Sequence, residues 1–407
     1  MTTTRPTRRP YAVPRAAVVV LLCAAGPALV AAPGTAYASG ADIQSRQWGL
    51  EALHARDAWQ TTKGEGVTVA VLDTGVDATH PDLSGTVLAG KDVVGFGAGR
   101  GDTAWARHGT AMAGLIAGHG HGDDRAEGML GVAPEAKILP VRVLLEDGDP
   151  QRAKARESRG GALAEGIRWA ADQGADVINL SLGDDSGSAH PEAREDEAVR
   201  YALRKGAVVV ASAGNGGEEG DHISYPAAYP GVIAATAVDR HGDRASFSTR
   251  RWYATVAAPG KDVIISEPDR RYYEGWGTSA AAAFVSGAVA LLRAAHPDLT
   301  PAQVKELIAE TARDTPEGGR SDELGTGIVD PAAAIEVGAS VSSKGQEAGP
   351  QPYRKRYFGA GPDTGGDGPG WVAPVAGVAG VLLTGAALAL LRGLRTRLRD
   401  GLRVRLR

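Results

Sequence analysis

The sequence predicts an α/β fold with an open, mostly parallel sheet and helices on both of its faces, plus one C-terminal transmembrane helix. Five nearly continuous apolar runs are typical of strands that are buried on both faces of a parallel sheet. Helical patterns alternate with these runs, as crossover connections between parallel strands require. The membrane helix is predicted from an uncharged stretch near the C-terminus. The expected strands are residues 67–73, 136–143, 175–181, 207–213 and 232–238.

The expected helices lie between and after these strands. A mostly polar segment near residues 50–59 is expected to be helical. A small-residue turn at 277–279 leads directly into an apolar helix that ends before Pro297. The helices expected between the strands are residues 108–117, 162–173 and 192–205.

Residues 1–38 have the features of a secretory signal peptide. Four arginines and no acid precede an apolar run at 16–32, and an Ala-Tyr-Ala tripeptide follows at 36–38, where we expect cleavage. A retained membrane anchor is the alternative, disfavoured because Gly and Pro at 26–27 interrupt the run. Cys23, the one cysteine in the chain, lies in this run, so the mature chain is expected to have no disulfide.

The C-terminal part is expected to anchor the chain in a membrane. Residues 371–391 would form a helix about 31 Å long, enough to cross the hydrocarbon core. Seven arginines opposed by one acid follow at 392–407, so we expect a cytoplasmic tail and an extracellular main domain. An amphipathic surface helix is the weaker alternative, because the stretch is apolar all round. Residues 337–370, rich in Gly, Ser and Pro, are expected to be a flexible tether.

This division leaves a short N-terminal segment at 39–62 and a main domain at 63–336. The whole chain has a net charge of −4, which becomes −14 once the +4 of the first 38 residues and the +6 of the last 16 are set aside. A strongly acidic exported part disfavours nucleic acid as a partner. A nucleotide site is also disfavoured, because the Gly-Glu-Gly sequence at 64–66 precedes a strand and a phosphate loop follows one.

Polar or glycine-rich residues follow three of the expected strands and are expected to meet at one edge of the sheet. They are Asp73, the sequence Ser-Leu-Gly at 181–183, and Gly214 with Asn215. Ligands of open α/β sheets bind at the carboxyl ends of the strands. This edge is therefore the expected site.

Three residues in this arrangement suggest nucleophilic catalysis. Ser279 opens a helix, where unpaired N–H groups and the helix dipole suit an acyl-transfer nucleophile. A buried acid such as Asp73 can orient a histidine such as His108, which then takes the serine proton. Each residue alone has a simpler interpretation, namely a helix cap, a turn cap or a helix-terminal histidine. Together they give the order Asp, His, Ser, which belongs to subtilisins.

Successive blocks of the sequence resemble those of the subtilisin-like serine proteases over residues 48–335. The resemblance implies a protease domain at 63–336, an Asp73-His108-Ser279 triad, Asn215 as oxyanion donor and a cis bond between Tyr225 and Pro226. The blocks are DTGVDATHPDL, HGTAMAGLIAG, GVAPEAKILPVRVL, GADVINLSLG, VVVASAGN, YPAAYPGVIAATAV, GTSAAAAFVSG and LGTGIVDP.

Substrate is expected to bind as an extended strand between two glycine-containing segments, because glycines permit close backbone approach and free edges permit β-pairing. Leu182 suggests an apolar wall for the adjoining pocket. The expected substrate-binding residues are Ser181, Leu182, Gly183, Ala213 and Gly214.

Within this family, the layout and the segment QWGLEALHARDAW look like the mycosins, membrane-anchored proteases associated with type VII secretion in actinobacteria. This resemblance implies an extracellular endopeptidase at the cell membrane, a protein or peptide substrate and a type VII membrane complex as partner. A subtilisin fold that serves mainly as a structural component of such a complex is the alternative. The intact triad and Asn215 favour catalysis over a purely structural role.

Three features depart from the family pattern. Ala283 stands where subtilisins commonly have proline, so its N–H is expected to donate to the Ser279 carbonyl and tighten the helix start. The seven residues between Ala38 and Arg46 are too few for a folding prodomain. Mycosins often have disulfides, whereas this N-terminal segment is expected to be held by packing alone.

No cofactor or metal is expected. Calcium is common in the family, yet the acid-rich loops lack a specific ligand spacing. A metal-dependent hydrolase is disfavoured, because His119 and His121 have no partner helix of the HExxH type. The acid-rich loops contain Asp123 and Asp124, Glu218 and Glu219, and Asp221.

Overall fold

The computed structural model describes residues 43–341. The predicted signal peptide, membrane span and arginine tail lie outside the described residues, as does nearly all of the tether. Everything below concerns the described part of the chain.

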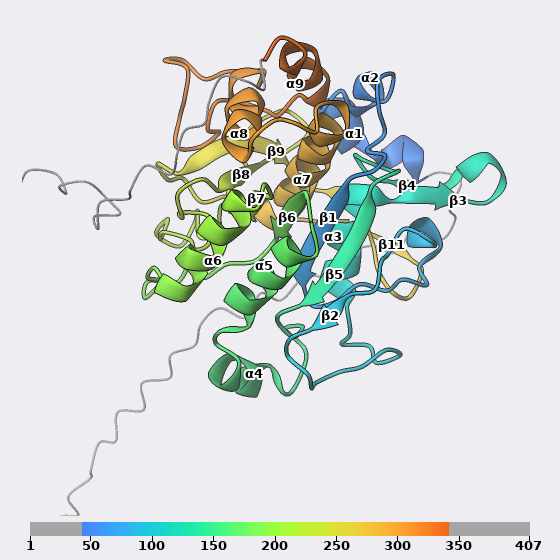
Figure 1. The fold of residues 1–407 in the computed structure, drawn as a ribbon, viewed down its shortest axis with the longest axis vertical. Coiled ribbons are helices and arrows are strands. Elements are labelled where there is room, and N and C mark those ends of the chain that lie inside the picture. The colour runs from blue at the N-terminus through green and yellow to red at the C-terminus, as the bar shows by residue number, and fades with distance from the viewer. Residues whose placement is uncertain (1–42, 342–407) are drawn as a thin grey trace, which may run out of the picture. The chain divides into compact units, whose positions relative to one another are not determined.

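A seven-stranded sheet, in which all neighbours are parallel, forms the centre of the domain (Figure 1). Its order is β2-β5-β1-β6-β7-β8-β9, so the chain begins inside the sheet, places β2 at one edge with β5 between β2 and β1, and then adds β6 to β9 in order toward the other edge. The five predicted strands are confirmed, while β2 and β9 were not predicted. The bounds are β1 Thr68–Asp73, β2 Lys91–Asp92, β5 Lys137–Arg142, β6 Val177–Leu180, β7 Val208–Ser212, β8 Ile233–Val238 and β9 Ala254–Pro259.

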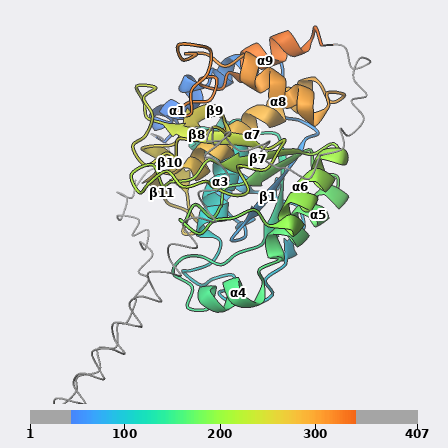
Figure 2. The same ribbon diagram turned by 90° about the vertical axis from the view of Figure 1, so that its left-hand side faces the viewer.

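Helices cover both faces of this sheet. In β1, Val69 and Val71 pack into one hydrophobic cluster with α3 and α7, whereas Ala70 and Leu72 pack into the other with α5 and α6 (Figure 2). A strand buried on both faces must be apolar at every position, which is why the apolar runs predicted a parallel sheet. The helices are α1 Trp48–Ala52, α2 Ala55–Ala58, α3 Arg107–Ala117, α4 Arg152–Ser158, α5 Ala162–Asp172, α6 Ala193–Arg204, α7 Thr278–Ala295, α8 Pro301–Glu310 and α9 Pro331–Gly338.

Shorter elements complete the fold. Two antiparallel hairpins, which were not predicted, pair β3 with β4 and β10 with β11. Their bounds are β3 His119–His121, β4 Glu127–Leu130, β10 Val263–Ser266 and β11 Tyr272–Gly275, and the 3-10 helices are η2 Gln44–Arg46, η3 Pro81–Leu83 and η4 Asp123–Arg125.

α7 runs through the core. It is the one helix among residues 43–341 with the length and mean hydropathy of a membrane span, and 83% of it is buried inside the fold. Packing against β6, β7, β8 and β9 makes it the central helix of its face of the sheet.

The N-terminal segment is fastened to the domain by hydrogen bonds as well as by packing. The helix expected at 50–59 is divided into α1 and α2 by His54, which has a left-handed backbone with φ of 52°. His54 Nδ1 lies 2.8 Å from Asp330 Oδ2, and the indole N–H groups of Trp48 and Trp59 donate to the carbonyls of Asp262 and Val132 at 2.9 and 2.8 Å. The expectation that packing alone holds the N-terminal segment was therefore incomplete, because these hydrogen bonds also hold it.

The bond between Tyr225 and Pro226 is cis, as predicted.

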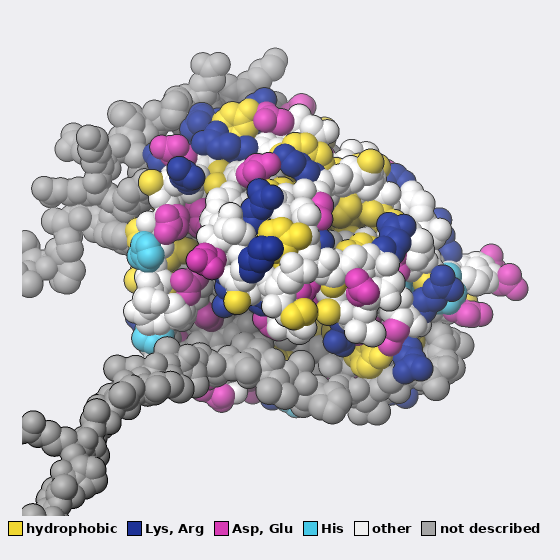
Figure 3. Space-filling view, turned by 90° about the horizontal axis from the view of Figure 1, so that it is seen from below, with side chains coloured by type: hydrophobic (Ala, Val, Ile, Leu, Met, Phe, Trp, Pro, Cys, Tyr) yellow, Lys and Arg dark blue, Asp and Glu magenta, His cyan; other side chains and the backbone are white. Residues whose placement is uncertain are grey.

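On the face of the molecule seen in Figure 3, Lys and Arg side chains alternate with Asp and Glu side chains. No single sign of charge dominates that face.

Candidate active site

Asp73 and His108 come together at the carboxyl end of β1. Asp73 is the last residue of the strand and is fully buried, and His108 is the second residue of α3. His108 Nδ1 lies 2.9 Å from both carboxylate oxygens of Asp73, and Thr74 N donates to Asp73 Oδ1 at 2.7 Å. These partners assign the imidazole proton to Nδ1, which leaves Nε2 free to accept one.

Ser279 is the second residue of α7, the helix that packs against α3. Its hydroxyl donates to the Ser181 carbonyl at 3.1 Å, and the Ser181 hydroxyl donates to the Ser279 carbonyl at 2.8 Å. These two hydrogen bonds join the backbone just after β6 to the first turn of α7. In the described part of the chain no hydrogen bond joins Ser279 Oγ to His108, and such bonds are often long in active sites without substrate.

Asn215 is held in place by the turn that precedes Ser279. Its Oδ1 accepts from both the N–H and the hydroxyl of Thr278 at 2.9 Å, and its own N–H donates to Asp185 Oδ2 at 2.7 Å. Because Oδ1 is fixed in this way, the orientation of the Nδ2 donor is fixed as well.

Gly277 keeps space open beside that donor. It has a φ of 138°, and a Cβ placed on it would lie 3.7 Å from Ser279 N and 3.8 Å from Asn215 Nδ2. Both N–H donors therefore border one small volume that a side chain at 277 would fill. A developing oxyanion needs two such donors.

Exposure increases along the segment 181–183, where Ser181 is buried, Leu182 is half-buried and Gly183 is exposed. Residues 213–214 differ from the expectation. Ala213 N donates to the Ala235 carbonyl and its own carbonyl accepts from Tyr253 Oη, both at 2.9 Å. Gly214 N donates to Thr278 Oγ1 and its carbonyl accepts from Thr249 N. The expectation of a free edge there was wrong, because β8 lies along β7.

A buried network behind the site was not predicted. Asn179 Nδ2 donates to Ser181 Oγ at 3.0 Å, and Asn179 Oδ1 accepts from Ser286 Oγ at 2.9 Å. The network links β6 to the middle of α7 and orients the Ser181 hydroxyl. The spacing of Asn179 and Ser181, two residues apart in a strand, places both on one face and was the available signal.

The chain matches the family described as the Subtilase family over residues 64–327. This chain is a subtilase. It is accordingly a serine endopeptidase that acts on protein substrates. Thermitase of Thermoactinomyces vulgaris is 38% identical over 274 residues, which cover 66% of this chain and 89% of thermitase. Fervidolysin of Fervidobacterium pennivorans is 37% identical over 328 residues, which cover 74% of this chain but only 45% of fervidolysin.

Solved structures of mycosins are also similar to this subtilase. MycP1 from Mycobacterium smegmatis has 28% sequence identity and a TM-score of 0.64, with 80% of this chain and 94% of that one covered. MycP3 protease, from the type VII (ESX-3) secretion system, has 32% identity and a TM-score of 0.60, with 75% and 94% covered. The predicted resemblance to both the subtilisin-like proteases and the mycosins is confirmed.

Ala283, which stands where subtilisins commonly have proline, is fully buried inside α7. The Ser279 carbonyl accepts a hydrogen bond from Ser181 Oγ at 2.8 Å, from outside the helix. The Ser181 side chain thus ties the start of α7 to the end of β6. The sequence did not predict that the Ser279 carbonyl accepts this hydrogen bond.

The two histidines weighed as metal ligands are engaged in hydrogen bonds. His119 contacts the carbonyls of Ser84 and Gly120, and His121 Nδ1 lies 2.6 Å from Asp82 Oδ1. Among residues 43–341, no group of three or more His, Cys, Asp or Glu side chains is arranged to hold a metal ion.

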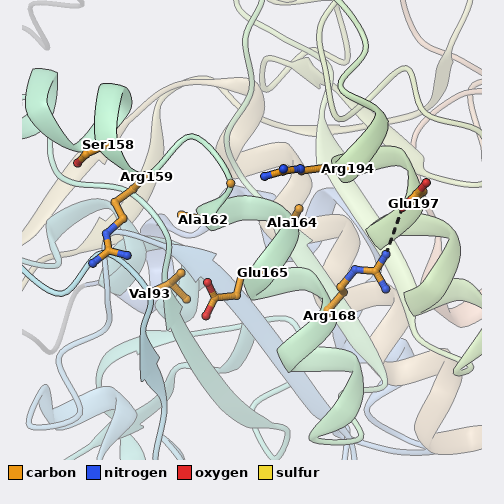
Figure 4. Close-up of a pocket in the computed structure, with 10 residues that line it drawn as sticks. Val93, Ser158, Arg159, Ala162, Ala164, Glu165, Arg168, Arg194 and Glu197 are labelled. Carbon is orange, nitrogen blue, oxygen red and sulfur yellow. Dashed lines mark ion pairs between the residues drawn. The ribbon is translucent and has the colours of Figure 1, made fainter.

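A separate hollow of about 360 Å³ opens among α4, α5 and α6 (Figure 4). None of the candidate active-site residues lines it. Glu165 in this hollow pairs with Lys91 at 2.7 Å, and Arg168 pairs with Glu197 at 3.7 Å. The hollow is a charged surface feature separate from the candidate active site.

Carboxylates control the protonation of His108. Burial alone would lower the pKa of this imidazole, but the charge and hydrogen bond of Asp73, together with the charges of Glu146 and Asp147, raise the pKa from 6.5 to about 9. Because the pKa is raised on folding, the ion pair stabilises the fold fully below pH 6.5 and loses this contribution as pH rises through about 9.

His108 is the predicted general base, and only a neutral imidazole can accept a proton, so hydrolysis by this subtilase is expected to increase with pH through about 9. The measurement is kcat/KM for a peptide substrate at constant ionic strength, since this ratio reports ionisation of the free enzyme. Thermal melting over the same pH range separates titration from unfolding. A plateau already reached at neutral pH would contradict the expectation.

Proposed function

We propose that the chain is a membrane-anchored extracellular serine endopeptidase that uses Asp73, His108 and Ser279 as its triad. The observation that carries this is the contact of His108 Nδ1 with both oxygens of the buried Asp73 at 2.9 Å. That contact orients Nε2 as a general base and stabilises the imidazolium that forms when Ser279 attacks. Asp73 keeps its negative charge throughout.

The reaction proceeds by acyl transfer. Ser279 Oγ attacks the scissile carbonyl while its proton passes to His108 Nε2, and the carbonyl oxygen becomes an oxyanion. Asn215 Nδ2 and Ser279 N donate to that oxyanion beside Gly277. The imidazolium then gives its proton to the leaving amine, and water hydrolyses the acyl-enzyme by the same steps.

The substrate backbone binds along Ser181, Leu182 and Gly183. Ala213 and Gly214 form a wall of the binding site and do not pair with the substrate strand. Support comes from the engaged N–H and carbonyl groups of Ala213 and Gly214. Gly183 also lies close to a second segment, because a Cβ on it would approach Ser224 Oγ to 2.8 Å. A side chain there would also meet the Tyr225 carbonyl oxygen at 2.9 Å, so only glycine fits between the two segments.

The site is tested by covalent labelling with a fluorophosphonate, which reacts with activated serines. Digestion and mass spectrometry are expected to place the label on the peptide that contains Ser279, and His108→Ala is expected to prevent labelling. The control is heat-unfolded protein, in which the serine is not activated. A label on another serine of the folded protein would reject Ser279 as nucleophile.

The finer assignment is to type VII secretion. It is supported by the similarity to MycP3, from the type VII (ESX-3) secretion system, and to MycP1, an essential component of the type VII (ESX-1) secretion system. The uncharged stretch at 371–391 and the arginines after it support a single membrane anchor with the protease domain outside the cell.

Protease added to intact cells is expected to release the domain by cutting within residues 337–370, because this tether lies outside the membrane in the proposed topology. The released fragment is followed by immunoblotting with antibodies to the domain. A cytoplasmic protein serves as the control for cell integrity. Protection of the domain until the membrane is broken would reverse the proposed orientation.

A further inference from the structure

The helix that carries His108 has no cap of its own. α3 begins after Ala106, whose backbone is left-handed with φ of 55° and whose side chain has no acceptor. The first N–H groups of a helix lack intrahelical partners and need acceptors. Here two other elements supply them: Glu146 Oε1 accepts from His108 N at 2.9 Å, and Thr74 Oγ1 accepts from Gly109 N at 3.1 Å.

The loop that presents Glu146 is itself held firmly. Leu145 is buried and packs with Val94 and Ala155, and its carbonyl accepts a hydrogen bond from Arg152. The carbonyl of Glu146 accepts from Asp149 N at 3.0 Å, which closes a turn. The Glu146 carboxylate therefore reaches α3 from a fixed support.

Several charged groups surround the imidazole of His108. Asp73 contacts it from β1, and Glu146 and Asp147 act on it from the loop after β5. The nearby cations have carboxylate partners of their own: Arg107 of α3 binds both oxygens of Glu267 at 2.8 Å, and Arg152 of α4 pairs with Asp147 at 2.7 Å.

We propose that Glu146 is a positioning residue: its carboxylate caps the catalytic helix from outside and holds His108 in register between Asp73 and Ser279. This inference rests on the proposed role of His108 as general base. The hydrogen bond fixes the backbone from which the imidazole extends, and the negative charge favours the imidazolium that forms during attack. Glu146 and Asp147 are neighbours, but it is the Glu146 carboxylate that accepts the hydrogen bond from His108 N of α3.

Two variants separate the hydrogen bond from the charge in the full-length chain. Glu146→Gln keeps an acceptor of the same reach and removes the charge, whereas Glu146→Asp keeps the charge and withdraws the acceptor. Asp147→Asn is the matched control, since it removes a neighbouring charge that has no hydrogen bond to α3. Each protein is titrated with fluorophosphonate, so that kcat refers to active molecules, and kcat and kcat/KM are measured over pH.

Glu146→Asp is expected to lower the high-pH plateau of kcat by roughly 10-fold, with the midpoint of the pH profile nearly unchanged, because a lost cap misplaces the base. Glu146→Gln is expected to keep the plateau within about 3-fold and to move the midpoint down by roughly 0.5 to 1 in pH, because a nearby negative charge is lost. Asp147→Asn is expected to keep the plateau and move the midpoint by less than Glu146→Gln does.

A plateau of kcat in Glu146→Asp equal to the wild type would overturn the positioning role, as would identical profiles in all three variants. These outcomes are distinct from failure of the proposed function. If hydrolysis does not depend on Ser279, the triad assignment fails. If hydrolysis depends on Ser279 and Glu146→Asp has the wild-type kcat, only the inference about Glu146 fails.

Discussion

Ser279→Ala is expected to lower kcat for peptide hydrolysis by roughly a million-fold, the loss that a subtilisin shows without its serine, and to abolish fluorophosphonate labelling. The nucleophile is removed, and only the oxyanion donors and substrate binding remain to promote attack by water. The variant is expected to fold, since the lost hydroxyl is a single hydrogen-bond donor to the Ser181 carbonyl. Circular dichroism and thermal melting check the fold.

Ser188→Ala is the matched control, because Ser188 is an exposed serine in the loop after β6. It is expected to hydrolyse and label like the wild type. Equal hydrolysis by wild type and Ser279→Ala would reject the triad.

Ser279→Ala also distinguishes a catalytic role in a secretion complex from a purely structural one. Secretion of type VII substrates is measured in cells that carry Ser279→Ala in place of the wild-type chain. Secretion that persists without hydrolysis would show a structural role beside catalysis. Secretion that is lost together with hydrolysis, in a variant that still folds, would make catalysis the required contribution.

The sheet, and the edge of it where the candidate site residues lie, could be predicted because each rests on local patterns. A strand buried on both faces must be apolar throughout, so β1 and β5 to β8 are visible as continuous runs. The carboxyl ends of parallel strands meet at one edge, so Asp73, Ser181 and Asn215 could be placed together before their contacts were known. β2 has two residues, which is too short for any periodic signal.

Contacts between distant segments could not be predicted in the same way. The cap from Glu146 to His108 joins residues 38 apart on different elements, and no spacing rule connects a loop carboxylate to a helix N–H. The hydrogen bond from Ala213 N to the Ala235 carbonyl forms because β8 lies beside β7, and that neighbour relation depends on the strand order of the sheet. The two hydrogen bonds between Ser181 and Ser279 likewise form only when the whole fold brings the end of β6 next to the start of α7.

Asn215→Ala is expected to lower kcat by roughly 100- to 1000-fold and to leave KM nearly unchanged, because its Nδ2 meets a negative oxygen only in the transition state. This magnitude is that of removing the corresponding kind of donor from a subtilisin. The measurement is steady-state kinetics on fluorophosphonate-titrated protein, with thermal melting to confirm the fold. An increase in KM at constant kcat would mean instead that Asn215 binds the ground-state substrate.

The anchor of Asn215 allows a sharper test of the same point. Oδ1 accepts from the N–H and the hydroxyl of Thr278, so Asn215→Asp keeps an acceptor for both bonds and loses only the Nδ2 donor. Asn215→Asp is therefore expected to fold like the wild type and to lose at least as much kcat as Asn215→Ala, because a carboxylate repels the oxyanion. If Asn215→Asp is more active than Asn215→Ala, the turn that Asn215 holds matters more than its donor, and the oxyanion would then depend chiefly on Ser279 N.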